Sequence, residues 1–264
     1  YRGRRAYYDD NGWYLNAWIR AYDVTGESKF LDEAKALFTA NTAGWDGTCG
    51  GGLWWNSNRD YKNAITNELF LLAAAQLHRR APNGTGAGSY YDWAFKEWNW
   101  FRTSGMINGS RMVNDGLGGN CANNGGITWT YNQGVILAGL VELWRITADR
   151  GYLYQAEQIA EATIANQVHP GGILREPCEI SGSCDGDQRM FKGIFAVGLA
   201  RLYFADPGNK PAYGAFLRTN ADSVWNTDRD AGNGLGLRWV GPPGSVDQAT
   251  QTSAGLLLDQ AVYA

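Results

Sequence analysis

The chain has 264 residues and a net charge of −3 at pH 7, and 44% of its residues are hydrophobic. This length allows one large domain with a sizeable core, and we expect a single domain over residues 1–264. The acidic balance argues against nucleic acid as a partner, and no run of about 20 apolar residues is present to span a membrane. The chain begins with Tyr1 rather than Met, as expected if a leader has been removed.

The first notable feature along the chain is the acid pair Asp9–Asp10, in the sequence YYDDNGW, where a polar turn enters a helical pattern. Cleavage of a glycosidic bond typically takes two carboxyl groups in different protonation states. Adjacent Cα atoms lie about 3.8 Å apart, so diverging side chains suit the roughly 5–5.5 Å separation of retaining glycosidases better than the wider gap of inverting ones. The same residues are also ordinary helix N-caps, and spacing alone favours that interpretation.

A repeat of about 60 residues organises the rest of the chain. In each repeat an aromatic residue opens an amphipathic helix after a short Gly-containing turn, such as Pro207-Gly208. These aromatic residues are Phe30, Tyr90, Tyr152 and Tyr213, at steps of 60, 62 and 61 residues. A period this long predicts a repeated pair of helices. The helices are expected at about 13–23 and 28–40, 61–79 and 88–102, 130–146 and 151–167, 187–204 and 210–226, with a last one at 246–262.

The two helices of each pair differ in their hydrophobic pattern. The first is apolar nearly all round, as in residues 136–141 and 194–199, and should be buried. The second alternates apolar and polar faces and should lie outside, with one face in water. An inner and an outer layer of helices predicts an all-α fold, a toroidal (α/α)6 barrel. Nine helices are predicted where a closed ring of six hairpins has twelve, so the first hairpin and one closing helix are expected to be missing from this chain.

The expected inner helices begin with acid or amide residues, and long Gly- and Trp-rich segments precede several of them. Loops on a rigid scaffold commonly carry function. If the inner helices are parallel, one mouth of the barrel collects acids, amides and aromatic rings, which is the lining expected for a neutral polyhydroxylated substrate. Flat rings pack either against sugar C–H faces or against other helices. With 12 Trp in the chain, both uses stay open.

Four cysteines indicate an oxidising compartment rather than a metal site. Cys178 and Cys184 enclose a short loop that suits a local disulfide, and Cys49 and Cys121 lie in Gly-rich segments where they could form a second bridge. Four cysteines allow three pairings, so the connectivity stays open. A zinc site is disfavoured because no close Cys pair exists and only two His are present. With no P-loop or dinucleotide fingerprint, we expect neither cofactor nor metal.

Five ordered motifs give the chain a resemblance to a known family. YYDDNGW, CGGGLWWN, YKNAITNELF, WTYNQGVILAGLVEL and DQRMFKGI resemble glycoside hydrolase family 76, the endo-α-1,6-mannanases, from about Tyr7 to the last residue. The resemblance implies an (α/α)6 barrel and retaining endo-hydrolysis of α-1,6-linked mannan, with α-1,6-mannan or manno-oligosaccharides as ligands. It places the nucleophile at Asp9 and the general acid/base at Asp10, and it implies a secreted or cell-surface protein. We expect a monomer.

The predicted sugar-binding residues belong to the same mouth. Of the two adjacent tryptophans, we expect one to pack inward and one to face the substrate. The amides that begin the helices near residues 132 and 187 are either helix-start groups or ligands of sugar hydroxyls. The full set of expected substrate-binding residues is Tyr8, Trp54, Trp55, Asn63, Asn67, Trp129, Tyr131, Asn132, Gln133, Asp187 and Gln188.

Other polar residues are expected to play supporting parts. Lys62 and Lys192 are predicted to form ion pairs or hydrogen bonds, and Asp115 and Asp185 are predicted to be solvated loop acids. Three other functions compete with hydrolysis. Fungal relatives are thought to act as transglycosylases that attach GPI-anchored mannoproteins to wall glycan. An enzyme for uronic-acid polymers is disfavoured, because such substrates favour basic subsites. A non-catalytic mannan-binding protein is disfavoured, because both carboxyls are present.

Overall fold

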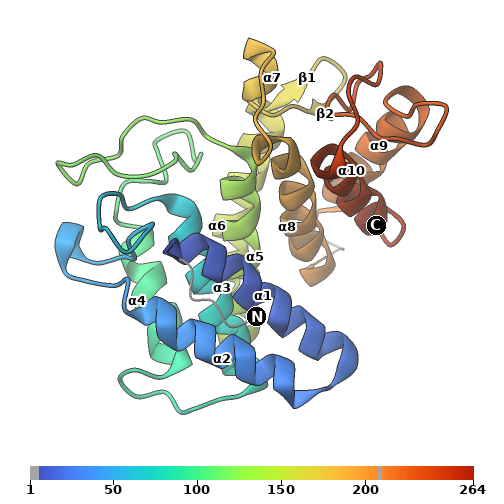
Figure 1. Ribbon diagram of the computed structural model, residues 1–264. Helices are drawn as coiled ribbons and strands as arrows, with labels where there is room; N and C mark the ends of the chain where they lie inside the picture. Colours follow the sequence, from blue (N-terminus) through green and yellow to red (C-terminus); the bar gives the residue numbers. More distant parts are fainter. Residues whose placement is uncertain (1–5, 207–209) are drawn as a thin grey trace. The chain divides into compact units, whose positions relative to one another are not determined.

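The computed structural model describes residues 6–206 and 210–264, and these form two compact units. Unit 1 comprises the chain up to Gly126 together with residues 142–150, and unit 2 comprises residues 127–141 and 151–264. The expected Pro207-Gly208 turn lies outside the described residues. Figure 1 shows the elements of each unit along the chain.

Unit 1 contains two helical hairpins. They consist of α1 (Tyr8–Thr25) with α2 (Ser28–Thr42), and α3 (Ala64–Arg80) with α4 (Tyr90–Phe101), and the short 3₁₀ helix η1 (Thr48–Gly50) lies between them (Figure 1). Helix α1 ends at Gly26, whose φ of 71° allows the chain to turn back into α2. Every residue of α3 from Ala64 to Leu77 is buried, whereas α2 and α4 each bury one face. The predicted contrast between inner and outer helices is therefore confirmed for the α3–α4 hairpin. Helix α1, predicted to be an inner helix, buries four residues, which is fewer than its partner α2.

Unit 2 is built around the first part of α5 (Thr130–Thr147) and the helices α6 (Arg150–Asn166), α8 (Phe191–Ala205), α9 (Pro211–Thr227) and α10 (Gln248–Ala261). A small antiparallel hairpin, β1 (Val168–His169) and β2 (Ile173–Leu174), pairs Val168 with Leu174 and precedes the one-turn helix α7 (Cys178–Ser181). The 3₁₀ helix η2 (Gln188–Met190) leads directly into α8.

Glycines allow the buried helices of unit 2 to approach closely. A Cβ at Gly198 on α8 would lie 2.0 Å from the carbonyl oxygen of Gly134 on α5, and one at Gly193 would lie 2.4 Å from the carbonyl of Ser253 on α10. No real side chain tolerates such a contact, so α8 packs backbone-to-backbone against both neighbours. This packing explains why glycines occur inside helices that are otherwise strongly apolar.

The nine long helices predicted from the sequence are confirmed among the described residues, with shifts at their ends. Helix α1 begins at Tyr8 instead of residue 13, because acidic residues are favourable in the first turn of a helix and extend it. Helix α8 begins at Phe191 instead of residue 187, and the residues before it form η2. The β1–β2 hairpin and α7 were not predicted, because they are too short to show a hydrophobic period.

Both predicted disulfides are present. Cys49 pairs with Cys121 in unit 1, across 72 residues of sequence, and Cys178 pairs with Cys184 in unit 2, across 6 residues. No free cysteine remains. Two structural disulfides are typical of proteins from an oxidising compartment.

Removing the two disulfides separately should destabilise the protein unequally. A cross-link restricts the unfolded chain more when it closes a longer loop, and the chain-entropy model gives about 4 kcal/mol for the Cys49–Cys121 loop and about 2 kcal/mol for the Cys178–Cys184 loop. Urea unfolding of the paired serine variants measures both losses. A larger loss for the short loop would show that native-state strain, rather than loop closure, decides the order.

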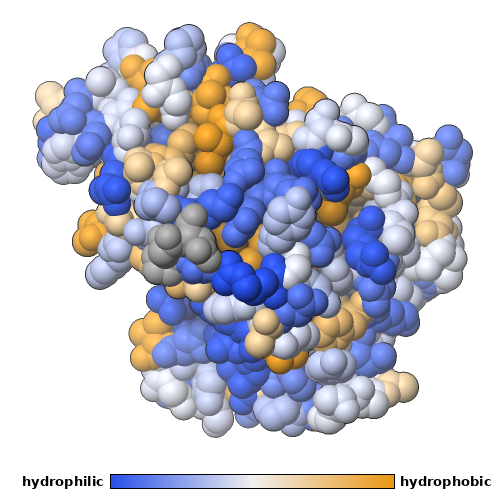
Figure 2. All heavy atoms as spheres, turned by 180° about the vertical axis from the view of Figure 1, so that it is seen from behind, coloured by the Kyte–Doolittle hydropathy of each residue, from blue (hydrophilic) through white to orange (hydrophobic). Residues whose placement is uncertain are grey.

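Hydrophilic residues cover much of the face drawn in Figure 2, with smaller hydrophobic areas between them. Among the residues that the structure describes, no helix has the length and apolar character to cross a bilayer.

Candidate active site

The acid pair lies in the first turn of α1, and neither residue is its N-cap. Tyr7 occupies the cap position and makes no side-chain capping hydrogen bond. Asp9 and Asp10 follow as the second and third residues of the helix, and both are half-buried. The capping interpretation of the pair therefore does not describe this structure, although the helix N-terminus still favours the ionised form of nearby carboxyls.

The Asp9 carboxyl is held by two hydrogen-bond donors. The backbone N–H of Asp10 donates to Oδ1 over 2.8 Å, and the indole Nε1 of Trp55 donates to Oδ2 over 2.8 Å. Backbone hydrogen bonds fix Trp55 in turn, because Tyr8 N donates to its carbonyl and its own N–H donates to the carbonyl of Tyr61, each over 2.7 Å. The loop that carries Trp55 is thereby tied to the start of α1, and the carboxyl is fixed in position.

Burial raises the pKa of Asp9 to about 6, and the negative charge of Asp10 adds to this effect. The hydrogen bonds from Trp55 and from the Asp10 backbone act in the opposite direction. Because the folded-state pKa exceeds the ordinary value of 3.8, the stability that Asp9 contributes at low pH is lost as the pH rises from about 4 to about 6. Above about pH 6 the group is an ionised carboxylate in a partly dry setting.

Replacing Trp55 by Phe should raise the pKa of Asp9 above 6. The substitution keeps a ring beside Tyr7, whose centroid lies 4.8 Å from that of Trp55, but removes the N–H that stabilises the carboxylate. A hydrogen bond to a charged group is worth about 1.5–3 kcal/mol, which corresponds to an upward shift of about one pH unit or more. The carboxyl ¹³C shift of Asp9, followed against pH, measures it. Trp54→Phe is the control and should leave this titration unmoved, because the Trp54 indole bonds Asp46 instead.

Tyr61 connects the Trp55 ring to a second polar group. The Tyr61 ring packs edge-on against Trp55 with centroids 6.4 Å apart, and its hydroxyl donates to Asp115 Oδ2 over 2.5 Å. Asn124 Nδ2 donates to the same hydroxyl oxygen over 2.9 Å. Burial and Asp115 together raise the pKa of the Tyr61 phenol above its usual range. Asp115 is therefore a half-buried partner of Tyr61, and the prediction that it is a solvated loop acid was wrong.

Lys62 and Trp54 anchor the loop around η1. The buried Lys62 Nζ lies 3.0 Å from Asp46 Oδ1 and donates to the carbonyls of Thr48, Gly51 and Gly52 over 2.6–2.9 Å. Trp54 Nε1 donates to the other oxygen of Asp46 over 2.8 Å. The ion-pair role predicted for Lys62 is confirmed. The two adjacent tryptophans thus serve different partners, Trp54 the Asp46–Lys62 pair and Trp55 the Asp9 carboxyl.

The other unit 1 candidates are packed beside these groups. The Asn67 amide accepts from Leu53 N over 2.6 Å and donates to the carbonyls of Leu53 and Asn63, so it braces the loop before Trp54. Asn63 is buried at the start of α3. A Cβ at Gly44 would lie 3.0 Å from the Tyr8 ring, which shows that this ring packs against that glycine. Direct sugar contacts by Tyr8, Asn63 and Asn67 stay predictions.

The unit 2 candidates near residue 130 gather around Phe191. The Tyr131 ring stacks on Phe191 at 3.8 Å with an interplanar angle of 4°, and the Trp129 ring meets it edge-on at 5.7 Å. Gln133 Nε2 donates to the carbonyl of Trp129 over 3.0 Å. Asn132 is completely buried, and within the described ranges its amide has no hydrogen-bond partner. Sugar binding by these four residues likewise stays a prediction.

Glu176 fixes the start of α5, and no motif or spacing in the sequence pointed to this residue. Its Oε1 accepts from the backbone N–H of Thr130 over 3.0 Å, and its Oε2 accepts from the Thr130 hydroxyl. The residue lies 46 positions away in sequence, and it is completely buried. Glu176 therefore acts as a helix cap supplied from a distant segment.

Asp187 and Gln188 belong to a turn organised by Asp185. Asp185 Oδ1 accepts from the backbone N–H groups of Asp187 and Gln188 over 3.0 and 2.9 Å, and Gln188 Oε1 accepts from Asp185 N over 3.1 Å. Asp187 is exposed and is the N-cap residue of η2. Asp185 therefore has a turn-forming role that the prediction of a merely solvated acid missed. Sugar binding by Asp187 and Gln188 stays a prediction.

Within unit 1, then, the structure brings the fixed Asp9 carboxyl, next to Asp10, together with Trp55 and Tyr61, and within unit 2 it gathers rings around the start of α5. No cluster of three or more potential metal ligands was found in the described part of the chain. A carboxyl pair at a helix start, surrounded by aromatic rings on a frame of paired helices, is typical of the class of α/α-fold glycoside hydrolases.

The comparison with family models gives the family. The model described as Glycosyl hydrolase family 76 matches residues 1–261, and the chain belongs to this family. The resemblance inferred from the five motifs is thereby confirmed.

Curated relatives carry consistent names. The chain is 32% identical over 226 residues to the mannan endo-1,6-alpha-mannosidase DCW1 of Candida albicans, a match that covers 80% of this chain and 49% of the relative. It is 34% identical over 227 residues to DCW1 of Saccharomyces cerevisiae, covering 81% and 49%. The chain thus spans about half the length of the curated relatives it matches.

Solved structures confirm the fold. The GH76A alpha-1,6-mannanase from Salegentibacter sp. HEL1_6 matches with a TM-score of 0.88 at 23% identity, covering 98% of this chain and 77% of that one. The Lin0763 protein from Listeria innocua matches with a TM-score of 0.85 at 26% identity, covering 98% and 73%. The predicted all-α fold of the (α/α)6-barrel type is therefore confirmed.

Proposed function

We propose that this chain is a retaining, endo-acting glycoside hydrolase that cleaves α-1,6-mannosidic linkages of mannan. The observation that carries the proposal is the Asp9 carboxyl, fixed by Trp55 and by the Asp10 backbone at the start of α1 in a chain of family 76. Two adjacent carboxyl groups can supply the two roles that retaining hydrolysis requires, a nucleophile and a general acid/base.

In the proposed first step an Asp9 oxygen attacks the anomeric carbon, and Asp10 gives its proton to the departing glycosidic oxygen. The carbon–oxygen bond of the linkage breaks as the bond to Asp9 forms, which leaves a covalent mannosyl-enzyme. In the second step Asp10 takes a proton from water, whose oxygen attacks the same carbon and releases Asp9. The hydrogen bonds from Trp55 and from the Asp10 backbone only partly offset the burial that raises the pKa of Asp9 to about 6, so Asp9 is in the attacking carboxylate form above about pH 6.

The relatives support the substrate. The curated relatives are named mannan endo-1,6-alpha-mannosidases. An inactive variant of the Salegentibacter enzyme, in which two consecutive aspartates are replaced by asparagine, was solved with α-1,6-mannotriose. A consecutive aspartate pair is what Asp9–Asp10 offers in this chain. The two disulfides favour a secreted or cell-surface setting, where mannan would be met.

The deciding experiment is a reducing-end assay on unbranched α-1,6-mannan, with NMR of the first product. We expect internal cleavage with release of reducing ends and an α-anomer as the first product. Binding of mannan without release of reducing ends would make the protein a mannan-binding module instead. New, longer products that form only when acceptor mannosides are added would assign it as a transglycosylase.

A further inference from the structure

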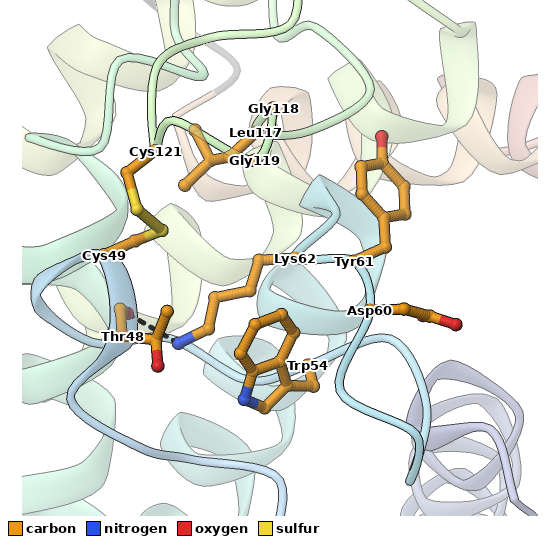
Figure 3. A pocket seen from close by; sticks show the side chains of 10 residues that line it. All are labelled: Thr48, Cys49, Trp54, Asp60, Tyr61, Lys62, Leu117, Gly118, Gly119 and Cys121. Carbon is orange, nitrogen blue, oxygen red and sulfur yellow. Dashed lines mark hydrogen bonds between the residues drawn. A yellow bond between two sulfur atoms is a disulfide. The ribbon is translucent and has the colours of Figure 1, made fainter.

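We propose that the pocket beside the Cys49–Cys121 disulfide is a further subsite, which binds one neutral pyranose unit of a glycan chain that extends away from Asp9 and Asp10. This inference rests on the proposed function. The pocket lies entirely within unit 1, and Figure 3 shows the disulfide on one side of it and Tyr61 on the other, with Trp54 and the Lys62 side chain between them.

The pocket has the size of part of one sugar ring. Its volume is about 90 Å³. A water molecule needs roughly 10–15 Å³ on this measure, so there is room for roughly six to nine water-sized groups. A pyranose unit carries somewhat more heavy atoms than that, so one edge or face of the ring enters while the rest stays in solvent. The pocket is too small for two units.

The lining combines an aromatic ring with a few fixed polar groups. The half-buried Trp54 indole and the buried Leu117 supply apolar surface, and the Tyr61 hydroxyl supplies a polar group that Asp115 and Asn124 already orient. An amphipathic site of this kind suits a ligand with both C–H faces and hydroxyl groups, because rings pack on the former and oriented polar groups bond the latter. A sugar ring has both.

The charges of the pocket select a neutral ligand. Lys62 lines it, but its ammonium is engaged by Asp46 and by three backbone carbonyls, so its charge is already satisfied. The one further charged residue in the lining is Asp60, which is an exposed acid. Among the lining residues, an anionic sugar would therefore meet a like charge and no cation without a partner, whereas a neutral hexose is not repelled by Asp60 and needs no cation.

The pocket is connected to the acid pair through a single aromatic contact. Trp55 bonds Asp9 and packs against Tyr61, and Tyr61 lines the pocket. Trp54, the neighbour of Trp55, lines the pocket as well. Of these two consecutive residues, Trp55 thus bonds the Asp9 carboxyl and Trp54 lines the pocket. A glycan held at Asp9 that continues in this direction reaches the pocket with one of its next units.

The pocket is also formed in advance of binding. The disulfide ties the loop around η1 to the turn at residues 117–121, where Cys121 N donates to the carbonyl of Gly118 over 2.9 Å and Leu117 N donates to the carbonyl of Lys62 over 3.0 Å. Cys49 and Cys121 hold left-handed φ values of 57° and 62°. Such conformations persist where the surroundings fix them, and rigid walls lower the entropic cost of binding.

The test measures binding without turnover. In an Asp9→Asn/Asp10→Asn background, calorimetry gives the dissociation constants of α-1,6-manno-oligosaccharides of two to six units. Trp54→Ala removes the ring, and Gly119→Trp adds bulk at a lining glycine whose Cβ position is open and whose φ needs no glycine. We expect each to weaken binding of the longest oligosaccharides about tenfold and to leave the disaccharide unchanged, since one ring contact is worth about that factor.

The matched control is Gly109→Trp. Gly109 also lies in a loop of unit 1 with open space at its Cβ position, and it does not line the pocket, so its variant should bind every length as the background does. Unchanged affinity for long chains in both pocket variants would overturn the subsite while the proposed function stands. Failure of the background protein to bind any of these oligosaccharides would overturn both. If Trp54→Ala fails to fold, Gly119→Trp alone decides, because it alters an exposed position.

Discussion

Asp9→Asn should lower the rate of mannan hydrolysis by about a thousandfold or more, because it removes the proposed nucleophile. The substitution is close to isosteric, but both Asp9 oxygens accept hydrogen bonds. One of the two donors, the Asp10 backbone or Trp55, must therefore face an amide NH₂ that cannot accept. Initial rates on α-1,6-mannan measure the loss. Near-normal hydrolysis by this variant would remove Asp9 from the mechanism.

Asp10→Asn provides the matched comparison, because loss of the nucleophile and loss of the general acid should affect the rates on two substrates differently. Loss of a general acid costs roughly 10²–10⁴ in rate on mannan, but it should matter little for an aryl mannoside, whose leaving group needs no proton. The Asp9 variant should be slow on both substrates. Added azide should restore activity to Asp9→Asn, with inversion at the anomeric carbon. The reverse pattern, with aryl mannoside rescuing Asp9→Asn, would exchange the two roles.

The helices were predictable because the burial of a helix determines which of its positions are apolar in the sequence. Every residue of α3 from Ala64 to Leu77 is buried, and a segment buried on all sides is apolar almost throughout. The amphipathic helices that pack outside it follow the same logic with one polar face. Cys178 and Cys184 were predictable as a pair because so short a loop brings them together whatever the fold.

The arrangement of the site was less predictable, because it depends on long-range contacts. Trp55 meets Asp9 across 46 positions, and Tyr61 meets Asp115 across 54. Nothing local in the sequence distinguishes Asp115 from a solvated loop acid. The acid pair itself was visible, but its first-turn position, rather than a capping one, required knowing where α1 begins. Sequence motifs identified the candidate site residues, whereas tertiary contacts determine which partners hold their side chains in place.

Lys192 is the second position where a single substitution should have a large effect, in this case on stability. The ammonium group is buried and lies 2.6 Å from Glu179 Oε1, and it donates to the carbonyl of Leu237 over 2.6 Å. It also lies 4.6 Å from the centre of the Trp239 ring. This ion pair, predicted in outline from the sequence, ties the start of α8 to α7 and to the segment before α10. The same Glu179 oxygen, Oε1, also accepts a hydrogen bond from the backbone N–H of Glu176 over 2.8 Å. The ion pair is therefore linked to the residue that caps α5.

Lys192→Met should destabilise unit 2 by about 3–5 kcal/mol, because it removes the ammonium 2.6 Å from the buried Glu179 carboxylate. The carboxylate keeps His169 Nε2 at 3.3 Å, but burial lowers the pKa of His169 and disfavours its charged form. Urea unfolding measures the loss. Lys210→Met is the control, since Lys210 pairs with Glu161 in a much more exposed setting and such pairs are worth about 0–1 kcal/mol. If both variants lose the same free energy of unfolding, the contribution of the Lys192 ion pair to stability does not depend on its burial.

The pH dependence of the Lys192 variant separates loss of charge from loss of packing. Burial raises the pKa of Glu176 to about 8 and that of Asp228 to about 7, and the charge of Lys192 lowers both. Loss of this cation should therefore raise the pKa of both carboxyls further. A carboxyl whose folded pKa exceeds its unfolded one loses stability as the pH rises, so the deficit of Lys192→Met should be smaller at pH 5 than at pH 8. Adding Glu179→Gln should recover part of the loss at pH 8 and little at pH 5. A deficit independent of pH would instead mean that the lysine acts through the packing of its side chain and not through its charge.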